Sequence, residues 1–275
     1  MSLTAKSVVS VVAFLLLNGC VGAGNVAFTT WGEEYIEDAI PSAEFEDGWQ
    51  IKFSKFNVVI QDIKVASSKG GMGSSMSGQK VFDLTKKGPV DVVKFEKLPA
   101  DRWNEVSYAI APASGSATAG NADAADVTKM NTDKLSLHVI ASATKGSITK
   151  TFDWAFTTKT GYVDCESAEG GKGVVIPTGS TATVQLTIHG DHLFYDDLQS
   201  PDAKLRFDAI AAADANSDGT VTLEELAAVS LTTLPLTQYG TGGAAQVKNL
   251  RDFVTSLSRT VGHYQGEGEC TQKIE

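Results

Sequence analysis

The sequence contains only one long hydrophobic run, and that run lies at its N-terminus. The lack of further runs excludes a protein with several membrane-spanning helices. Basic residues are also scarce, because 23 Lys and Arg stand against 33 Asp and Glu and leave a net charge of -10. This balance excludes recognition of nucleic acid through a basic face. It is typical of an acidic exported protein or of one that meets cations.

What remains is a chain with the length for a substantial core. Its 275 residues are 42% hydrophobic and 20% charged, which favours one large folded domain or two smaller ones over a disordered chain. The 26 glycines indicate many turns.

The N-terminal segment is typical of an export signal. Lys6 supplies a positive charge, and the apolar run of residues 8–17 is too short to span a bilayer permanently. The run ends in Leu-Asn-Gly-Cys at 17–20, which resembles the lipobox of bacterial lipoproteins. The resemblance implies a signal peptide at 1–19 and a lipid on Cys20. The alternative is an ordinary secretory signal with an incidental cysteine.

The residue after Cys20 is Val21 and not the Asp associated with inner-membrane retention. The resemblance therefore implies a membrane partner reached through the lipid anchor, at the outer membrane of a Gram-negative bacterium. We interpret residues 20–30 as the lipidated N-terminus and a tether.

Two further cysteines, Cys165 and Cys270, form an even pair. In an oxidising compartment this favours a disulfide between them. The alternative is two unpaired buried thiols.

From residue 49 to about 188, apolar residues recur with period two, which predicts strands. Shifts of phase within 49–65 indicate bulges in one long strand or a hairpin. Further strands are predicted at 81–84, 90–95, 105–111, 134–141, 148–156, 173–176 and 181–189. We expect residues 31–196 to form an antiparallel sandwich-like β domain.

After residue 197 the period becomes helical, with helices predicted at 201–213, 223–231 and 246–261. The fold class is therefore α+β, with a helical segment at 197–275 packed on the β domain.

Residues 214–225 resemble the calcium-binding loop of the EF-hand family. Oxygen ligands stand at positions 1, 3, 5 and 12, a backbone carbonyl at position 7 and glycine at position 6. These residues are Asp214, Asn216, Asp218, Glu225, Thr220 and Gly219. A bidentate Glu and seven oxygens favour Ca²⁺ over Mg²⁺.

The loop has no second copy in the sequence, so the groove opening of paired sensor loops is not expected. We interpret the predicted Ca²⁺ as structural. The alternative is a degenerate loop without metal.

A second metal site is suggested by the four histidines. His189, Asp191 and His192 stand together, and Gly190 permits a sharp bend between the imidazoles. A disulfide at Cys270 would bring His263 toward them. Such a cluster suits Cu²⁺ or Zn²⁺, although surface histidines with local hydrogen bonds are the alternative. His138 alternates with apolar neighbours and is predicted on the solvent face.

The order of strands in residues 49–113 is similar to that of MbnP-like periplasmic β-sandwich proteins, which are associated with copper. The similarity rests on the long strand of 49–65, the VFDL segment at 81–84 and the segment at 94–113. It implies a sandwich fold and a copper-associated role, and it identifies no ligand residue.

The sequence thus predicts a non-enzymatic, calcium-binding lipoprotein of the cell envelope with an unknown protein or small-molecule partner. A periplasmic copper or zinc protein is the first alternative. A hydrolase of envelope polymers is the second, although no Gly-x-Ser-x-Gly or His-Glu-x-x-His motif occurs.

Overall fold

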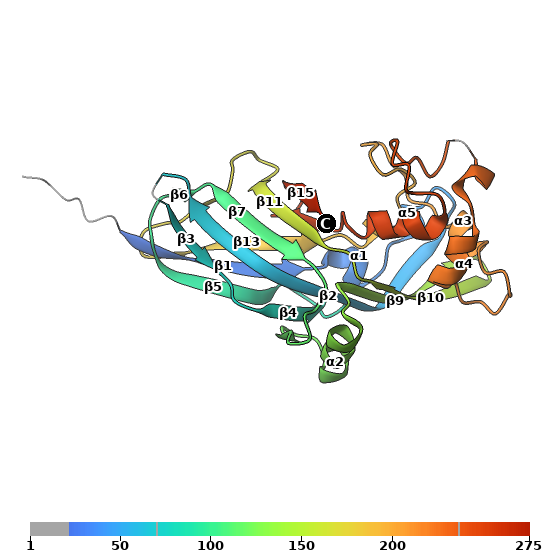
Figure 1. Cartoon of the computed structure of the whole chain (residues 1–275), viewed down its shortest axis with the longest axis horizontal. Helices are drawn as coiled ribbons and strands as arrows, with labels where there is room; N and C mark the ends of the chain where they lie inside the picture. The colour runs from blue at the N-terminus through green and yellow to red at the C-terminus, as the bar shows by residue number, and fades with distance from the viewer. Residues whose placement is uncertain (1–21, 70, 236) are drawn as a thin grey trace, which may run out of the picture.

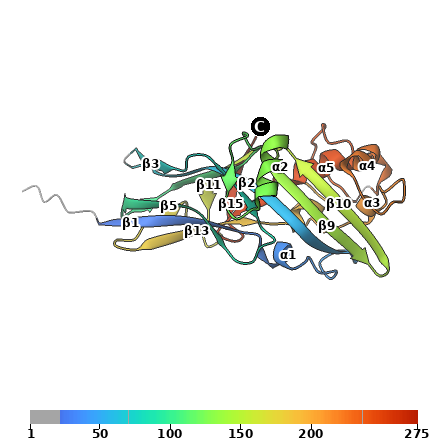
Figure 2. The ribbon, with the colours of Figure 1, turned by 90° about the horizontal axis from the view of Figure 1, so that it is seen from below.

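The computed structural model describes residues 22–69, 71–235 and 237–275. The predicted signal peptide and Cys20 lie outside these residues. Strands form most of the body, and three short helices gather at the end where β9 (Leu137–Lys145) and β10 (Ile148–Phe156) lie (Figure 1 and Figure 2). These helices are α3 (Asp208–Ala211), α4 (Leu223–Ala228) and α5 (Leu250–Leu257). None of the helices in the described ranges is long and apolar enough to cross a membrane. The β-rich α+β class is confirmed.

The larger sheet is built around β2, whose 18 residues pair with strands on both sides. Its register shifts between Phe53 and Lys55 and again between Gln61 and Lys64, which confirms one long strand with bulges. The strands of this sheet are β2 (Gln50–Ser67), β3 (Met72–Ser75), β4 (Gln79–Asp83), β7 (Glu105–Ile110), β8 (Thr118–Ala119), β9 (Leu137–Lys145), β10 (Ile148–Phe156), β11 (Thr160–Glu166) and β15 (Glu269–Ile274).

The smaller sheet has the order β14-β13-β1-β5. Its strands are β1 (Ala23–Trp31), β5 (Val90–Pro99), β13 (Thr181–Ile188) and β14 (Gly262–Tyr264). The prediction of a tether at 20–30 was wrong from residue 23 onward, because β1 lies between β13 and β5 with Val26 and Phe28 fully buried. The β1–β13 pair is parallel, so the sandwich is not purely antiparallel. A two-stranded ribbon joins β6 (Arg102–Trp103) to β12 (Val174–Val175).

One apolar core joins residues of both sheets and of the C-terminal helices, including Phe28 of β1, Phe56 of β2 and Phe253 of α5. A smaller cluster lies under α2 (Ala124–Asp133), where Met130 packs with Val59 and Val81. The core thereby holds the ends of β13 and β14 in place.

The C-terminal helices are shorter than predicted. The helix expected at 201–213 is confined to α3 (Asp208–Ala211), because the preceding backbone forms bridges from Leu205 to Phe45 and Tyr195. The helix expected at 223–231 is α4 (Leu223–Ala228), followed by the 3₁₀ turn η2 (Leu231–Thr233). The helix expected at 246–261 is α5 (Leu250–Leu257).

Helix α5 begins where the Asn249 side chain accepts a hydrogen bond from the Asp252 amide at 2.9 Å. Its predicted apolar stripe is confirmed, since Leu250, Phe253, Val254 and Leu257 are buried. Two short elements lie outside the C-terminal segment, namely α1 (Glu33–Glu37) and the 3₁₀ turn η1 (Asp191–Phe194).

The segment 197–275 is not wholly helical, because its last residues form β14 and β15 and return to both sheets. The predicted disulfide is confirmed. Cys165 of β11 and Cys270 of β15 are joined at a sequence separation of 105 residues. The bridge holds the chain end beside the strand that carries His263.

Candidate metal centres

Strand pairing brings His263 to His189. His263 of β14 lies opposite Thr187 of β13, and the His189 backbone N–H donates to the Val261 carbonyl at 2.8 Å. The two imidazoles are therefore neighbours although they are far apart in sequence. Their ring centroids lie 4.4 Å apart.

A tight turn at Gly190 returns His192 to the same place. A Cβ atom at residue 190 would lie 2.7 Å from Ile36 Cγ1 and 3.0 Å from Phe53 Cε2, so only glycine fits against this core. His192 follows in η1, with its ring centroid 4.9 Å from that of His263 and 5.4 Å from that of His189. The prediction that these three histidines come together is thus met by the structure.

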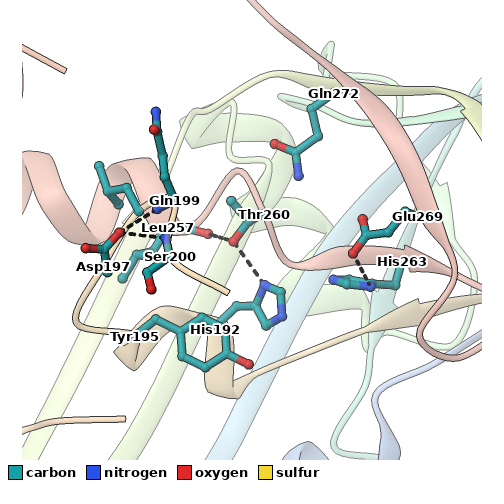
Figure 3. A pocket seen from close by; sticks show the side chains of 11 residues that line it. His192, Tyr195, Asp197, Gln199, Ser200, Leu257, Thr260, His263, Glu269 and Gln272 are labelled. Carbon is teal, nitrogen blue, oxygen red and sulfur yellow. Dashed lines mark hydrogen bonds and ion pairs between the residues drawn. The ribbon is translucent and has the colours of Figure 1, made fainter. Parts of the chain in front are cut away.

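Hydrogen bonding assigns the protonated nitrogen of His192. The Thr260 hydroxyl donates its hydrogen to the Leu257 carbonyl at 2.9 Å. Its oxygen lies 3.0 Å from His192 Nδ1 and therefore accepts a hydrogen bond from that nitrogen. His192 therefore carries its proton on Nδ1, which leaves the Nε2 lone pair free for an ion. Figure 3 shows His192 between Thr260 and the ring of Tyr195.

Carboxylates surround the imidazoles. His189 Nδ1 lies 4.0 Å from Asp191 Oδ1 and 4.0 Å from Glu33 Oε2, and His263 Nδ1 lies 3.9 Å from Glu269 Oε1. These separations are too long for hydrogen bonds. Tyr195 donates its hydroxyl to Asp191 Oδ2 at 3.1 Å and thereby holds this carboxylate in position.

Three polar atoms of the cluster are buried without a hydrogen-bond partner. They are His189 Nε2, His263 Nδ1 and Asp191 Oδ1. Buried polar groups in proteins are almost always paired, so a concentration of unpaired ones requires an explanation. All three are atoms of the kinds that bind metal ions in proteins.

Burial keeps the cluster ready for a cation at neutral pH. Desolvation, followed by the nearby imidazoles, lowers the pKa of His263 to about 4 and holds the pKa of His192 well below its usual value. Both rings are therefore neutral, as metal binding requires. Desolvation also raises the pKa of Glu33, Asp191 and Glu269. Of these three carboxylates only Asp191 is buried, whereas Glu33 is half-buried and Glu269 is exposed.

The ligand atoms form two groups of three. One contains His189, Asp191 and His192, the other contains His189, His263 and Glu267, and within each group the atoms lie within 4.8 Å of one another. Sequence reasoning missed Glu267, Glu269 and Glu33. The available signal for the first two was their place four and six residues after His263 in a glycine-rich turn.

A cavity of about 250 Å³ adjoins the cluster and reaches both His192 and His263. Its other walls include Tyr195, Glu269 and Gln272 (Figure 3). The cavity offers small solutes a polar path to the imidazoles.

The predicted calcium loop adopts a tight turn. Asp214 Oδ1 accepts from the Asp218 amide at 3.2 Å, and Asp214 Oδ2 accepts from the Gly219 amide at 3.0 Å. Gly219 has a φ of +86°, which favours glycine. Two more side-chain oxygens accept hydrogen bonds from backbone amides: Asn216 Oδ1 from Asp218 at 2.9 Å, and Asp218 Oδ1 from Thr220 at 2.7 Å.

Strand β10 pairs with this loop. The Thr151 amide donates to the Gly219 carbonyl and the Val221 amide donates to the Thr151 carbonyl, both at 2.8 Å. The Trp154 indole N–H donates to the Val221 carbonyl at 2.9 Å. The loop at 214–225 is thus held against β10 by backbone pairing and by the Trp154 indole.

The oxygens of the loop already have partners. Lys150 Nζ binds the fully buried Asp214 side chain, and Lys150 lowers the pKa of that carboxyl. Glu225 Oε2 accepts from the Thr222 amide and hydroxyl, both at 2.9 Å, and so caps α4. The structure therefore brings 214, 216 and 218 together, whereas Glu225 is engaged at the helix.

The prediction for His138 was wrong. Its side chain is buried, and its Nε2 lies 2.7 Å from Asp153 Oδ1 across the β9–β10 pair. Alternation alone misled here because β9 is covered on both faces along this stretch, where Leu137, His138 and Val139 are all buried.

Comparison with family models, with curated proteins and with solved structures returns no match. The resemblances to lipoproteins, to EF-hands and to MbnP-like proteins therefore stay predictions from the sequence.

Proposed function

We propose that this chain is a non-enzymatic metal-binding protein of the cell envelope that holds copper or zinc at His189, His192 and His263. The observation that carries the proposal is the group of three buried ligand atoms without hydrogen-bond partners. The sequence placed calcium first, but the unpaired imidazole cluster offers the stronger argument, so copper or zinc takes first place.

The chemistry of the donors supports the choice of ion. Imidazole nitrogen suits zinc and copper, whereas Ca²⁺ and Mg²⁺ require oxygen ligands. Thr260 orients one of the rings, and Tyr195 orients the adjacent carboxylate of Asp191. Such outer hydrogen bonds are the usual support of a metal ligand.

The location in the envelope is supported by the Cys165–Cys270 disulfide, because such bonds persist in oxidising compartments. The lipid on Cys20, the outer membrane and the copper association of MbnP-like proteins remain part of the proposal.

Calcium at residues 214–225 is the second candidate function. It is supported by the turn at Gly219 and by the pairing of the loop with β10. To bind there, Ca²⁺ must displace the Lys150 ammonium from Asp214, and Glu225 must turn away from the α4 N-terminus. Both requirements weaken binding, so we expect dissociation constants in the extracellular range of about 10⁻⁴–10⁻³ M.

Calorimetric titration of the chelator-treated protein with Zn²⁺, with Ca²⁺ held in excess, tests the first function. We expect submicromolar binding in the native chain and a loss of at least about 100-fold in His189→Ala. His138→Gln, which changes the histidine outside the cluster, serves as the control and should keep native affinity. Absence of heat in the native chain, or equal loss in the control, would contradict the proposal.

Fluorescence of Trp154 tests the second function, since its indole donates to the loop carbonyl of Val221. Ca²⁺ should change the emission in the native chain and in Trp49→Phe, but not in Trp154→Phe or Asp214→Ala. An unchanged response to Ca²⁺ in Asp214→Ala would remove the loop as the calcium site.

A further inference from the structure

The two groups of ligand atoms share His189. One group adds Asp191 and His192, and the other adds His263 and Glu267. Nitrogen and oxygen ligands lie about 2.0–2.2 Å from zinc, so atoms bound to one ion lie within about 4.4 Å of each other. The atoms of each group lie within 4.8 Å of one another, so a small adjustment of the side chains brings them within reach of one ion. Among the residues that the structure describes, no such group contains all three imidazoles. The groups therefore mark two positions for an ion instead of one.

The His189 ring can serve both positions. Its Nδ1 lies 4.0 Å from Asp191 Oδ1, on the side of the first group. Its Nε2 is buried and has no hydrogen-bond partner. An imidazole that loses its ring proton presents a lone pair on each nitrogen and can bridge two cations.

Carboxylates stand close to the imidazoles on several elements: Glu33, Asp191, Glu267 and Glu269. Each of the two groups contains one of them, the buried Asp191 in the first and the exposed Glu267 in the second. Each ion would therefore meet a carboxylate oxygen beside imidazole nitrogen, a set of donors that binds zinc.

The cavity beside the cluster reaches both positions. It is lined by His192 from the first group and by His263 from the second. Each ion could therefore enter from solvent and complete its coordination with water or with Glu269 from the cavity wall.

We propose that the cluster binds two transition-metal ions bridged by the His189 ring. The first ion binds His189 Nδ1, Asp191 and His192, and the second binds His189 Nε2, His263 and Glu267. Binding of the second ion displaces the ring proton of His189, which leaves to solvent. The inference rests on the proposed copper or zinc function and extends it to a dinuclear centre.

The number of bound ions tests the inference. The chain is saturated with Ca²⁺, loaded with Zn²⁺, desalted and measured by elemental analysis. We expect two Zn²⁺ per native chain, one in His192→Ala, one in Glu267→Gln, and two in the His138→Gln control. One ion per native chain would overturn the dinuclear centre and leave the proposed function intact, whereas none would overturn both. Thermal unfolding in chelator checks that every variant is folded.

Loading with Cu²⁺ tests the bridge itself. Two Cu²⁺ ions joined by an imidazolate couple their electron spins, so the native chain should give a paramagnetic resonance signal well below its copper content. His192→Ala, with one Cu²⁺, should give a signal equal to its copper content. A full-intensity signal from two Cu²⁺ in the native chain would show separate sites and contradict bridging by His189.

Discussion

The histidine cluster and the loop at 214–225 represent opposite kinds of metal site. The loop is local, with all its proposed ligands within 12 consecutive residues, and its polar atoms are paired to backbone amides, to Lys150 and to the N-terminus of α4. The cluster is assembled from the residue that follows β13, from η1 and from β14, and it keeps buried ligand atoms without partners. A site whose polar atoms are already hydrogen-bonded gains little free energy from binding an ion, whereas a site with unpaired buried atoms gains much.

The largest expected difference is therefore in thermal stability. At the same free concentration of about 10⁻³ M, Zn²⁺ stands at about 1,000 times its submicromolar dissociation constant or more and should stabilise the native chain by at least about 4.1 kcal/mol. Ca²⁺ stands at about 1–10 times its constant and should add only about 0.4–1.4 kcal/mol. At about 2–4 °C per kcal/mol for a chain of this size, scanning calorimetry should record the larger rise in Tm with Zn²⁺. An equal or larger rise with Ca²⁺ would reverse the comparison.

The second test concerns acid. The pKa of His263 falls from 6.5 to about 4 on folding, so the unfolded chain takes up a proton between these values and the folded chain does not. In the metal-free protein, the contribution of His263 to the free energy of unfolding is complete above pH 6.5 and is lost as the pH falls toward 4. The raised pKa values of Glu33, Asp191 and Glu269 act in the opposite direction and flatten the decline.

The contribution of His263 is isolated by comparing the native chain with His263→Gln. Between pH 7 and pH 4 the native chain should lose up to about 3 kcal/mol more in denaturant unfolding than the variant does. Parallel pH profiles for the two proteins would show that burial of His263 does not carry this effect.

A third variant tests the assignment of the ring proton to His192 Nδ1. Thr260→Val removes the hydroxyl that accepts from His192 Nδ1 and should weaken Zn²⁺ binding about 10- to 100-fold. Calorimetric titration measures the change, with Thr255→Val on α5 as the matched control. Native affinity in Thr260→Val would exclude a positioning role for this hydroxyl.

The smallest expected effect lies in the loop. Lys150→Met removes the ammonium group that competes with Ca²⁺ for Asp214, so calcium affinity should rise about tenfold, equivalent to about 1.4 kcal/mol. Lys145→Met, which changes a lysine on the neighbouring strand β9, should leave it unchanged. A weaker affinity in Lys150→Met would show that the lysine supports the loop instead of competing with the ion.

The same contrast explains what could be predicted from the sequence. The strands at 148–156 and 181–189, the Cys165–Cys270 bridge and the stripe of α5 follow from local periodicity or from counting cysteines. The sequence predicts a tether in place of strand β1 because Gly, Ala and Thr dilute its apolar pattern, although β1 is central in its sheet. Its position depends on β13 and β5, which no local signal reveals.

The proposed metal ligands also divide into those that the local sequence predicts and those that depend on the fold. His189 and His192 could be predicted from their spacing around Gly190, and His263 only through the expected disulfide. Glu33 could not be predicted, since it lies far from His189 in sequence and only the fold places it at 4.0 Å from His189 Nδ1. The hydrogen bonds between Glu225 and Thr222 could not be predicted either. A glutamate three residues after Thr222 fits both a capping box and the last ligand of a calcium loop.

Crystallography of the Zn²⁺-loaded chain at the zinc absorption edge tests the central claim most directly. We expect anomalous density about 2.0–2.1 Å from imidazole nitrogens of His189, His192 and His263, with the loop at 214–225 free of zinc when calcium is in excess. An anomalous map that is empty at the three histidines would contradict it.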